Sequence, residues 1–401
     1  MSTCIDSDHL WPHAGSSHFL SVGSTETLAA GQVGFGLSTT YLSRPIALTA
    51  ATPGPGGSLD YVIDNQVNTS FLWSYGVTNR LELDLVLPVT FGQSGSGTSS
   101  ITGTTAQNAV GNTATRDLRF GLAYTLAARE PVDPNAPIAP LTSARGNGFG
   151  VAARFDVSAP TGDTGEFATN GTAVWLPGIT ADYRYKALLV GTEVGMRIRP
   201  TQEFEGARIG TQGYFALGAA VDLLPRELFS LGAEAFILPT IAEQHTDSSL
   251  GVVGTQSTPN GQYITPAEWM VSARTAPLFG GALQIQLAGG GPLSFSGDEI
   301  TNPRFRFTLS LRYARVWRDS DGDGVADADD KCPFVRGIPN NPVGNGCPPS
   351  ATTERVDLTA TPLESPPVPT TTPSAPAPAP SLPSSSPEPP TPPSDAPPQS
   401  K

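Results

Sequence analysis

An aspartate-rich run that begins at residue 319 has the residue types and the spacing of a calcium-binding loop. Calcium takes six to eight oxygen ligands, and a twelve-residue loop supplies them from alternate positions, with glycine at the sixth position to permit a sharp turn. Gly324 occupies that sixth position. The twelfth residue is Asp where a calcium loop usually has Glu, and the alternative interpretation is an acidic, solvated linker. The predicted Ca²⁺ ligands are Asp319, Asp321, Asp323, Val325 through its carbonyl, Asp327 and Asp330.

Two cysteines that follow this run complete a pattern that resembles a known repeat. The phrases DSDGDGVADADDKCP and GNGCP are similar to a thrombospondin type 3 repeat, in which spaced aspartates precede Cys-Pro and a later Gly-Cys-Pro. A disulfide between Cys332 and Cys347 would close a loop of about sixteen residues, worth roughly 3 kcal/mol in the chain-entropy model. In bacteria such repeats commonly join a membrane barrel to a peptidoglycan-binding domain of the outer-membrane protein A (OmpA) family.

Phrases nearer the N-terminus extend the resemblance. LWPHAG, FLWSYGVTNRLELDL and SAPTGD resemble the N-terminal barrel region of the large OmpA-family proteins of myxobacteria and their relatives. The resemblance implies an outer-membrane barrel followed by a periplasmic linker. No peptidoglycan-binding domain follows the Pro-rich residues 350–401 in this sequence, so wall anchoring is not carried over.

Composition limits the class of partner. Only 15% of the residues are charged, 38% are hydrophobic, and the formal net charge is −13. Binding nucleic acid requires a basic face, so we expect no nucleic-acid partner, and divalent cations fit the charge better. The sequence has no uninterrupted apolar run of about 18 residues, so a membrane role would need strands instead of a helix.

The first residues, MSTCIDSDHLWPHAG, lack the charged and apolar regions of a secretory signal. We therefore expect the sequence to begin at or near the mature N-terminus. Cys4 is interpreted as an incidental residue. Its closeness to His9 and His13 is interpreted in the same way, because so short and polar a segment rarely builds a metal site.

The elements that must position these sites are strands. From residue 30 to 316 the sequence repeats segments of about ten residues in which apolar and polar positions alternate, the period of a strand with one apolar face. In LELDLVLPV, Leu83 and Leu85 share one face while Glu82 and Asp84 share the other. A soluble sandwich also alternates, but its outer face is normally rich in Lys and Glu. The predicted strands are 30–42, 65–76, 79–91, 115–127, 148–159, 173–185, 188–199, 208–223, 226–238, 267–277, 281–289 and 302–316.

The connections between these strands alternate in length, as the two ends of a bacterial barrel require. Short turns such as GVTN, RYKA and LPRE are predicted at the periplasmic end, together with both termini. Residues 128–147 break the rule because they are long but fall at the short-turn end. The long loops, predicted to be extracellular, lie near 43–64, 92–114, 160–172, 200–207, 239–266 and 290–301.

Charged residues on the inward faces are expected to pair in the lumen rather than to act as an acid–base pair. No histidine lies on a strand beside a matching serine, so we predict no catalytic or cofactor-binding residue and expect no enzyme. The predicted lumen network consists of Glu82, Asp84 and Glu193 with Arg119, Arg154 and Arg197. Aromatic residues near the predicted strand ends, where rings prefer the lipid–water boundary, are Trp73, Tyr75, Tyr124, Tyr183, Tyr185, Trp269, Tyr313 and Trp317.

The sequence therefore predicts an all-β chain. It comprises an N-terminal periplasmic segment (1–29), an antiparallel transmembrane β-barrel of about 12 strands (30–317), a thrombospondin type 3-like calcium-binding repeat (318–349) and a disordered Pro/Ser/Thr-rich tail (350–401). The predicted function is a structural or narrow-pore outer-membrane protein of a Gram-negative bacterium with a calcium-binding periplasmic linker. Its expected partners are outer-membrane lipid, calcium ions, and cell-wall or periplasmic proteins that meet the tail. The alternative is a soluble extracellular protein that uses the repeat for calcium-dependent adhesion.

Overall fold

The computed structural model divides the chain into two units, Met1–Pro349 and Ser350–Lys401. The second unit, which is the predicted disordered tail, lies outside the described residues. The described residues are 5–15, 17–54, 57–97, 109–129, 147–204, 207–223, 229–249, 255–259, 261–275, 278, 283–293, 302–314, 323, 325, 330–332 and 335–349.

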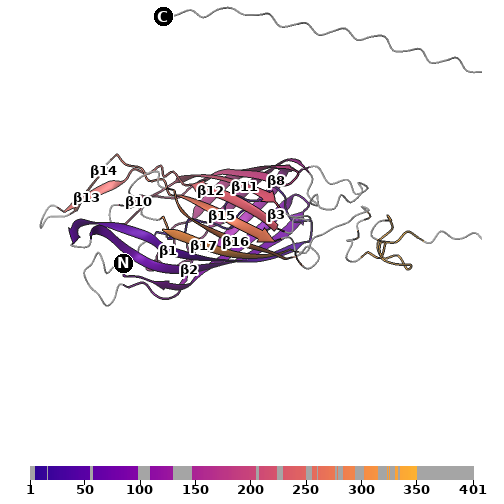
Figure 1. Ribbon diagram of the computed structural model, residues 1–401, viewed down its shortest axis with the longest axis horizontal. Coiled ribbons are helices and arrows are strands. Elements are labelled where there is room, and N and C mark those ends of the chain that lie inside the picture. The colour runs from indigo at the N-terminus through magenta and orange to yellow at the C-terminus, as the bar shows by residue number, and fades with distance from the viewer. Residues whose placement is uncertain are drawn as a thin grey trace, which may run out of the picture. The chain divides into compact units, whose positions relative to one another are not determined.

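Twelve strands form a closed antiparallel barrel (Figure 1). Each strand pairs with its neighbours along the chain, and β1 pairs with β17 to close the ring. The two-residue β4 (Ala114–Thr115) pairs with β3 at the edge of the barrel. The barrel strands are β1 (Val33–Gly54), β2 (Gly57–Thr78), β3 (Leu81–Ser94), β5 (Arg119–Ala127), β6 (Gly148–Ser158), β7 (Val174–Tyr185), β8 (Leu188–Arg197), β11 (Gln212–Asp222), β12 (Phe229–Ile237), β15 (Ala267–Thr275), β16 (Leu283–Pro292) and β17 (Phe305–Ala314).

The alternation in the sequence produces a barrel with an apolar outside and a polar inside. Along β17, Phe307 is 44% exposed on the outer wall while Arg306 beside it is 0% exposed on the inner wall. The same alternation runs along β3, where Leu83 is exposed and Glu82 and Asp84 are buried. Successive side chains of a strand point to opposite faces, so the polar residues of every strand share the interior. The predicted fold class and strand faces are confirmed.

The two ends of the barrel differ. At the turn end, β7 and β8 are joined by Lys186 and Ala187 alone, and Lys186 has a φ of 53°, the left-handed backbone of a tight hairpin turn. At the opposite, loop end, β1 and β2 continue as a hairpin with 22 residues in each strand. Smaller hairpins also stand in the loops: β9 (Gln202–Phe204) with β10 (Ala207–Ile209), and β13 (His245–Ser249) with β14 (Thr255–Pro259).

The predicted loops 43–64, 200–207 and 239–266 therefore contain strands. Most of the predicted long connection 128–147 lies outside the described residues. Among the described residues, no helix has the length and hydropathy to cross a membrane.

Exposed aromatic side chains gather on the outer wall at both ends of the barrel, as predicted for strand-end aromatics. Rings of this kind prefer the boundary between an apolar layer and water. Trp317 lies outside the described residues. At the turn end the exposed aromatics are Phe35, Tyr75, Tyr124, Phe149, Tyr183, Tyr185 and Tyr313, and at the loop end they are Tyr41, Phe91, Trp175, Phe215, Trp269 and Phe305.

Candidate functional site

The lumen of the barrel is filled by the chain's own N-terminal residues. Residues 5–15 and 17–32, called the luminal segment here, enter at the loop end and leave at the turn end, where Gly31 N–H donates to Gly76 O at 2.7 Å. Leu20, with an exposed fraction of 0%, belongs with Trp11 and Phe19 to the barrel's main apolar cluster. The predicted N-terminal periplasmic segment 1–29 is thus corrected in its described part, which lies inside the barrel and starts at the loop end.

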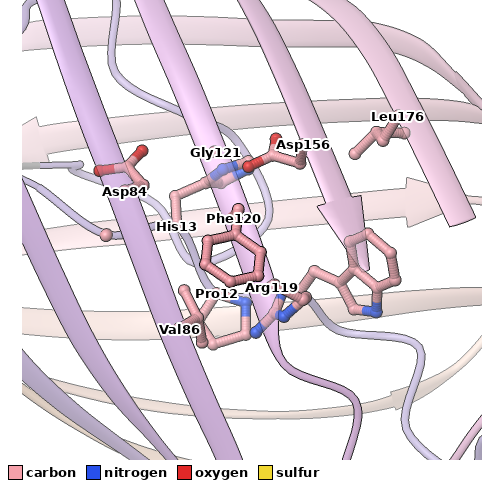
Figure 2. Close-up of a pocket in the computed structure, with 11 residues that line it drawn as sticks. Pro12, His13, Asp84, Val86, Arg119, Phe120, Gly121, Asp156 and Leu176 are labelled. Carbon is pink, nitrogen blue, oxygen red and sulfur yellow. The ribbon is translucent and has the colours of Figure 1, made fainter. Parts of the chain in front are cut away.

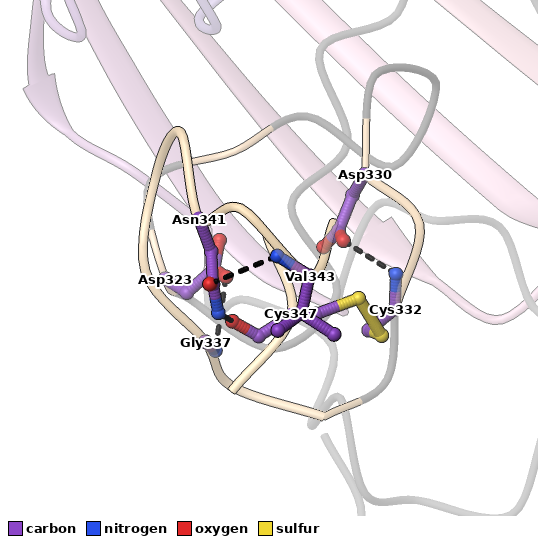
Figure 3. The surroundings of a disulfide bond; sticks show 7 residues. All are labelled: Asp323, Asp330, Cys332, Gly337, Asn341, Val343 and Cys347. Atoms are coloured by element: carbon purple, nitrogen blue, oxygen red, sulfur yellow. Dashed lines mark hydrogen bonds between the residues drawn. A yellow bond between two sulfur atoms is a disulfide. The ribbon is translucent and has the colours of Figure 1, made fainter. Parts of the chain in front are cut away.

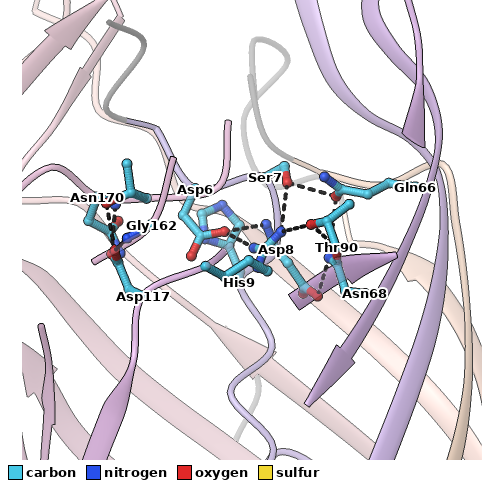
Figure 4. Close-up of polar contacts among 12 residues, drawn as sticks. Asp6, Ser7, Asp8, His9, Gln66, Asn68, Thr90, Asp117, Gly162 and Asn170 are labelled. Atoms are coloured by element: carbon cyan, nitrogen blue, oxygen red, sulfur yellow. Dashed lines mark hydrogen bonds and ion pairs between the residues drawn. The ribbon is translucent and has the colours of Figure 1, made fainter. Parts of the chain in front are cut away.

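At the loop end the luminal segment is anchored by two carboxylates (Figure 4). Asp6 forms an ion pair with Arg116, and Asp8 Oδ1 lies 2.9 Å from Arg306 Nη1. Asn68 Nδ2 donates to Asp8 Oδ2 at 3.0 Å. Since charged hydrogen bonds in a buried setting are the strong ones, these contacts fix the start of the segment against β2 and β17.

In the middle of the lumen an indole ring lies between two arginines. Trp11 has Arg197 at 4.4 Å and Arg119 at 5.0 Å from its ring, within the range of cation–π attraction. Arg197 also donates to His9 O at 2.9 Å. His13 Nε2 lies 3.2 Å from Glu193 Oε2.

Figure 2 shows the small cavity that remains beside this packing, of about 10 Å³, lined among others by Trp11, His13, Asp84, Arg119 and Asp156. A space of this size accommodates about one water molecule. The luminal segment therefore leaves room for about one water molecule beside Trp11 and His13.

Below this level the backbone of the luminal segment is held by carboxylates of the barrel wall. Glu234 accepts from Leu20 N and from Ser21 N and Oγ, at 2.6–3.1 Å. Glu193 accepts from Gly23 N at 2.7 Å, and Glu82 accepts from Leu28 N at 2.7 Å. These carboxylates supply the hydrogen bonds that buried backbone N–H groups outside regular structure require.

Two glycines of the wall make room for the ring of Phe19. A Cβ built on Gly218 would lie 2.6 Å from Phe19 Cδ1, and one on Gly191 would lie 3.0 Å from Phe19 Cε2. The absence of a side chain at these two positions lets the aromatic ring of the segment pack directly on β8 and β11. Wall and segment are therefore fitted to each other.

The predicted lumen network is present in part. Asp84 and Arg154 form an ion pair at 3.1 Å as predicted. Glu82 and Glu193, however, have backbone groups of the luminal segment as partners, and Arg119 and Arg197 lie against Trp11. Sequence reasoning missed these partners because the segment has no strand periodicity. A signal was present in the apolar residues of LWPHAGSSHFLSV, which a solvated segment would not need.

The predicted calcium ligands are described only in part (Figure 3). Asp319, Asp321 and Asp327 lie outside the described residues, and no group of three or more ionisable metal ligands forms among the residues that are described. Asp323 accepts from Val325 N at 2.8 Å and from Gly337 N at 3.0 Å. Asp330 Oδ1 accepts from Cys332 N at 2.6 Å.

The other oxygen of this carboxylate, Asp330 Oδ2, is buried with no hydrogen-bond partner among the described residues. A buried carboxylate oxygen of this kind is compatible with a cation ligand. The disulfide between Cys332 and Cys347 is formed, with 5.0 Å between the Cα atoms, and it ties the residues that follow Asp330 into one loop.

No protein-family model matches the chain. No curated protein matches it either. Among solved structures, an outer membrane channel from Pseudomonas putida F1 is 17% identical with a TM-score of 0.48, covering 73% of this chain and 98% of the channel. The NanC porin is 8% identical with a TM-score of 0.38, covering 70% of this chain and 98% of the porin.

The P. putida toluene transporter TodX is 11% identical with a TM-score of 0.36, covering 71% of this chain and 90% of TodX. The three sequence identities and the three TM-scores are low, so the activities of these proteins are not transferred to this chain. The closed barrel is shown by the pairing of the chain's own strands.

Proposed function

We propose that this protein is an outer-membrane β-barrel of a Gram-negative bacterium, a structural or narrow-pore protein that its own luminal segment holds closed. A calcium-binding linker would follow the barrel on the periplasmic side. The observation that carries the proposal is the inverted polarity of the barrel. Large apolar side chains such as Phe120, 49% exposed, cover the outer wall, while ionisable side chains such as those of Arg306 and Glu268 are buried inside.

This polarity is what a bilayer selects. In water, an outer wall of exposed Leu, Phe and Ile would lose the stabilisation that burial gives, at about 25 cal/mol per Å² of apolar surface. In a bilayer the same apolar wall contacts the apolar lipid tails. A closed barrel also leaves no strand edge with unpaired backbone groups. The aromatic groups at both ends of the outer wall fit the two interfaces of such a layer.

The closed lumen supports a scaffold or a gated narrow pore over an open channel. A barrel of this size has a narrow interior, and here the luminal segment fills it with apolar packing and with hydrogen bonds to carboxylates on several strands. Any passage of solute would require the segment to leave its place.

The calcium-binding linker is supported by the spacing of the aspartates and by the buried, unpartnered Asp330 Oδ2. Asp323 and Asp330 would be ligands, and the Cys332–Cys347 disulfide would limit how far the final carboxylate can move from the ion. The ion would offset the mutual repulsion of the six aspartates within the twelve residues 319–330.

Two measurements test the proposal. Membranes of cells that express the full chain are washed with alkaline carbonate, and the protein should stay in the membrane until detergent is added. Planar bilayers should then show no steady conductance for the wild type and clear channels for a variant that lacks residues 5–29.

Migration on unheated gels checks that the barrel of each variant is folded. If the deletion variant does not fold, the double variant Trp11→Ala, Phe19→Ala replaces it, since it retains the backbone of the segment and removes its ring packing. Release by carbonate would contradict the membrane location, and steady wild-type conductance would contradict the closed lumen.

A further inference from the structure

A polar groove on the outer wall at the loop end plays no part in the proposed function. It has a volume of about 550 Å³ and lies where β1, β2, β3 and the start of β17 meet. Two cationic side chains line it near the same level of the barrel: Ser43 pairs with Phe305, Arg44 follows Ser43 in the chain, and Arg304 precedes Phe305. The lining of the groove includes Tyr41, Arg44, Asp64, Asn65, Arg304 and Phe305.

Arg44 and Arg304 both line the groove, and both carry a positive charge. Two guanidinium groups that line one groove repel each other. Among the described residues, no ion pair includes Arg44 or Arg304, and the groove's carboxylate, Asp64, is exposed. An anion placed between the guanidinium groups would convert this repulsion into attraction.

The backbone and a neighbouring ring position Arg44 in advance. The register of β1 against β2 shifts after Ser43, and Arg44 has a φ of 50°, which is unusual for a residue other than glycine. Its guanidinium lies 4.4 Å from the centre of the Tyr61 ring. Such stacking restricts the guanidinium to few orientations, so less freedom is lost when a ligand binds.

The level of the groove on the outer wall indicates what kind of anion would reach it. Tyr41 and Phe305, which line it, belong to the exposed aromatics of the loop end, and Phe307 continues the apolar wall below them. The arginines thus lie just beyond the edge of the apolar surface. In a bilayer this is the depth of the headgroups.

We propose that the groove binds the phosphate headgroup of a membrane lipid, with the phosphate between Arg44 and Arg304 and an acyl chain along Tyr41 and Phe305. The planar guanidinium fork donates two parallel hydrogen bonds to phosphate oxygens, which suits a headgroup phosphate. The inference rests on the proposed membrane location and adds a defined lipid site to it.

The test uses the full chain, freed of lipid in detergent and verified as folded by its migration on unheated gels. Native mass spectrometry measures the binding of phosphatidylglycerol, of diacylglycerol with the same acyl chains, and of inorganic phosphate. The wild type should bind phosphatidylglycerol at least ten times more tightly than diacylglycerol. The variant Arg44→Gln, Arg304→Gln should lose at least tenfold in affinity for phosphatidylglycerol.

Matched variants separate a site from general electrostatics. The variant Arg80→Gln, Lys186→Gln removes the same charge from exposed positions at the turn end and should stay within twofold of the wild type. Asp64→Asn removes the negative charge of the groove and should tighten binding. The proposal is overturned by unchanged affinity in the groove variant, by an equal loss in the turn-end variant, or by equal binding of diacylglycerol.

Full displacement of the lipid by millimolar inorganic phosphate would instead identify a site for the free ion. That result would overturn the lipid assignment. Release of the protein by carbonate would refute the membrane location by a separate measurement. A negative lipid result with firm membrane retention would therefore refute this inference alone.

Discussion

Glu234→Gln is the sharpest perturbation of the luminal segment that the chain offers. The carboxylate of Glu234 is buried on β12 and accepts three donor groups of the segment, Leu20 N, Ser21 N and Ser21 Oγ. Glutamine has nearly the same shape but carries no charge. Its NH₂ group would also stand where the second oxygen now accepts from Leu20 N at 3.1 Å.

The expected effect follows from the number of donors. Hydrogen bonds to a charged group contribute about 1.5–3 kcal/mol each and neutral ones about 0.5–1.5 kcal/mol, so each of the three bonds weakens by roughly 1 kcal/mol. The seated state of the segment should lose about 3 kcal/mol relative to the displaced state. Because 1.4 kcal/mol is a factor of ten, the displaced population should rise roughly a hundredfold.

Cysteine labelling measures this population. Ala14, which is buried with Leu72 and Val86, is replaced by cysteine in a Cys4→Ser background, and the protein reacts with a water-soluble maleimide. Labelling requires the segment to leave its place, so its rate follows the displaced population when opening and closing are fast. The rate should rise roughly a hundredfold in Glu234→Gln, in line with the loss of about 3 kcal/mol.

Asp117→Asn is the matched control. Asp117 also accepts three donors, but these belong to the loop between β6 and β7: Gly162 N, Thr169 Oγ1 and Asn170 N (Figure 4). The Asp117→Asn variant should therefore label at a rate near the wild-type value. An unchanged rate in Glu234→Gln, or an equal rise in both variants, would refute the argument that wall carboxylates hold the segment.

Three further outcomes are expected. Leu309→Arg places a charge on the outer wall and should destabilise the folded barrel by about 2–4 kcal/mol in unfolding from lipid vesicles, whereas Thr308→Ala on the inner wall should cost about 1 kcal/mol for one hydroxyl hydrogen bond. Gly218→Ala forces a Cβ against Phe19 and should destabilise the barrel by about 1–3 kcal/mol, and Phe19→Ala in the same chain should restore part of the loss. Calorimetry on the whole protein should show calcium binding with a Kd of about 10⁻⁴ to 10⁻³ M that Asp323→Ala abolishes, and no calcium-dependent heat in the wild type would leave the aspartates as a solvated linker.

The barrel was predictable because its signal is local. A strand with one face in lipid and one in a polar lumen alternates residue by residue, so segments such as Leu81–Ser94 can be recognised without knowledge of their neighbours. The sequence did not predict that β1 and β2 extend beyond Ser43, because this extension carries no local signal of a strand. Its sequence includes TPGPGG, which indicates a loop, while its pairing depends on the facing strand.

The luminal segment was not predictable by these means. Its hydrogen bonds join residues far apart in sequence, such as Leu20 and Glu234, and no periodic pattern records such contacts. Asp84 with Arg154 was predictable because both residues lie on inward faces of strands that the alternation defines. The calcium site was predicted from the spacing of the aspartates alone. Asp319, Asp321 and Asp327 lie outside the described residues.

The path of the luminal segment constrains the order in which the protein is assembled. The ring closes only when β17, the last strand to be synthesised, pairs with β1, the first. If the barrel closed first, the luminal segment would have to thread through the lumen. Trp11 and Phe19 would then have to pass inner-wall residues that fit closely around them. Closure around a segment already in place avoids that threading. The fit between wall and segment therefore favours an order of assembly in which the luminal segment packs against the open sheet before β17 pairs with β1.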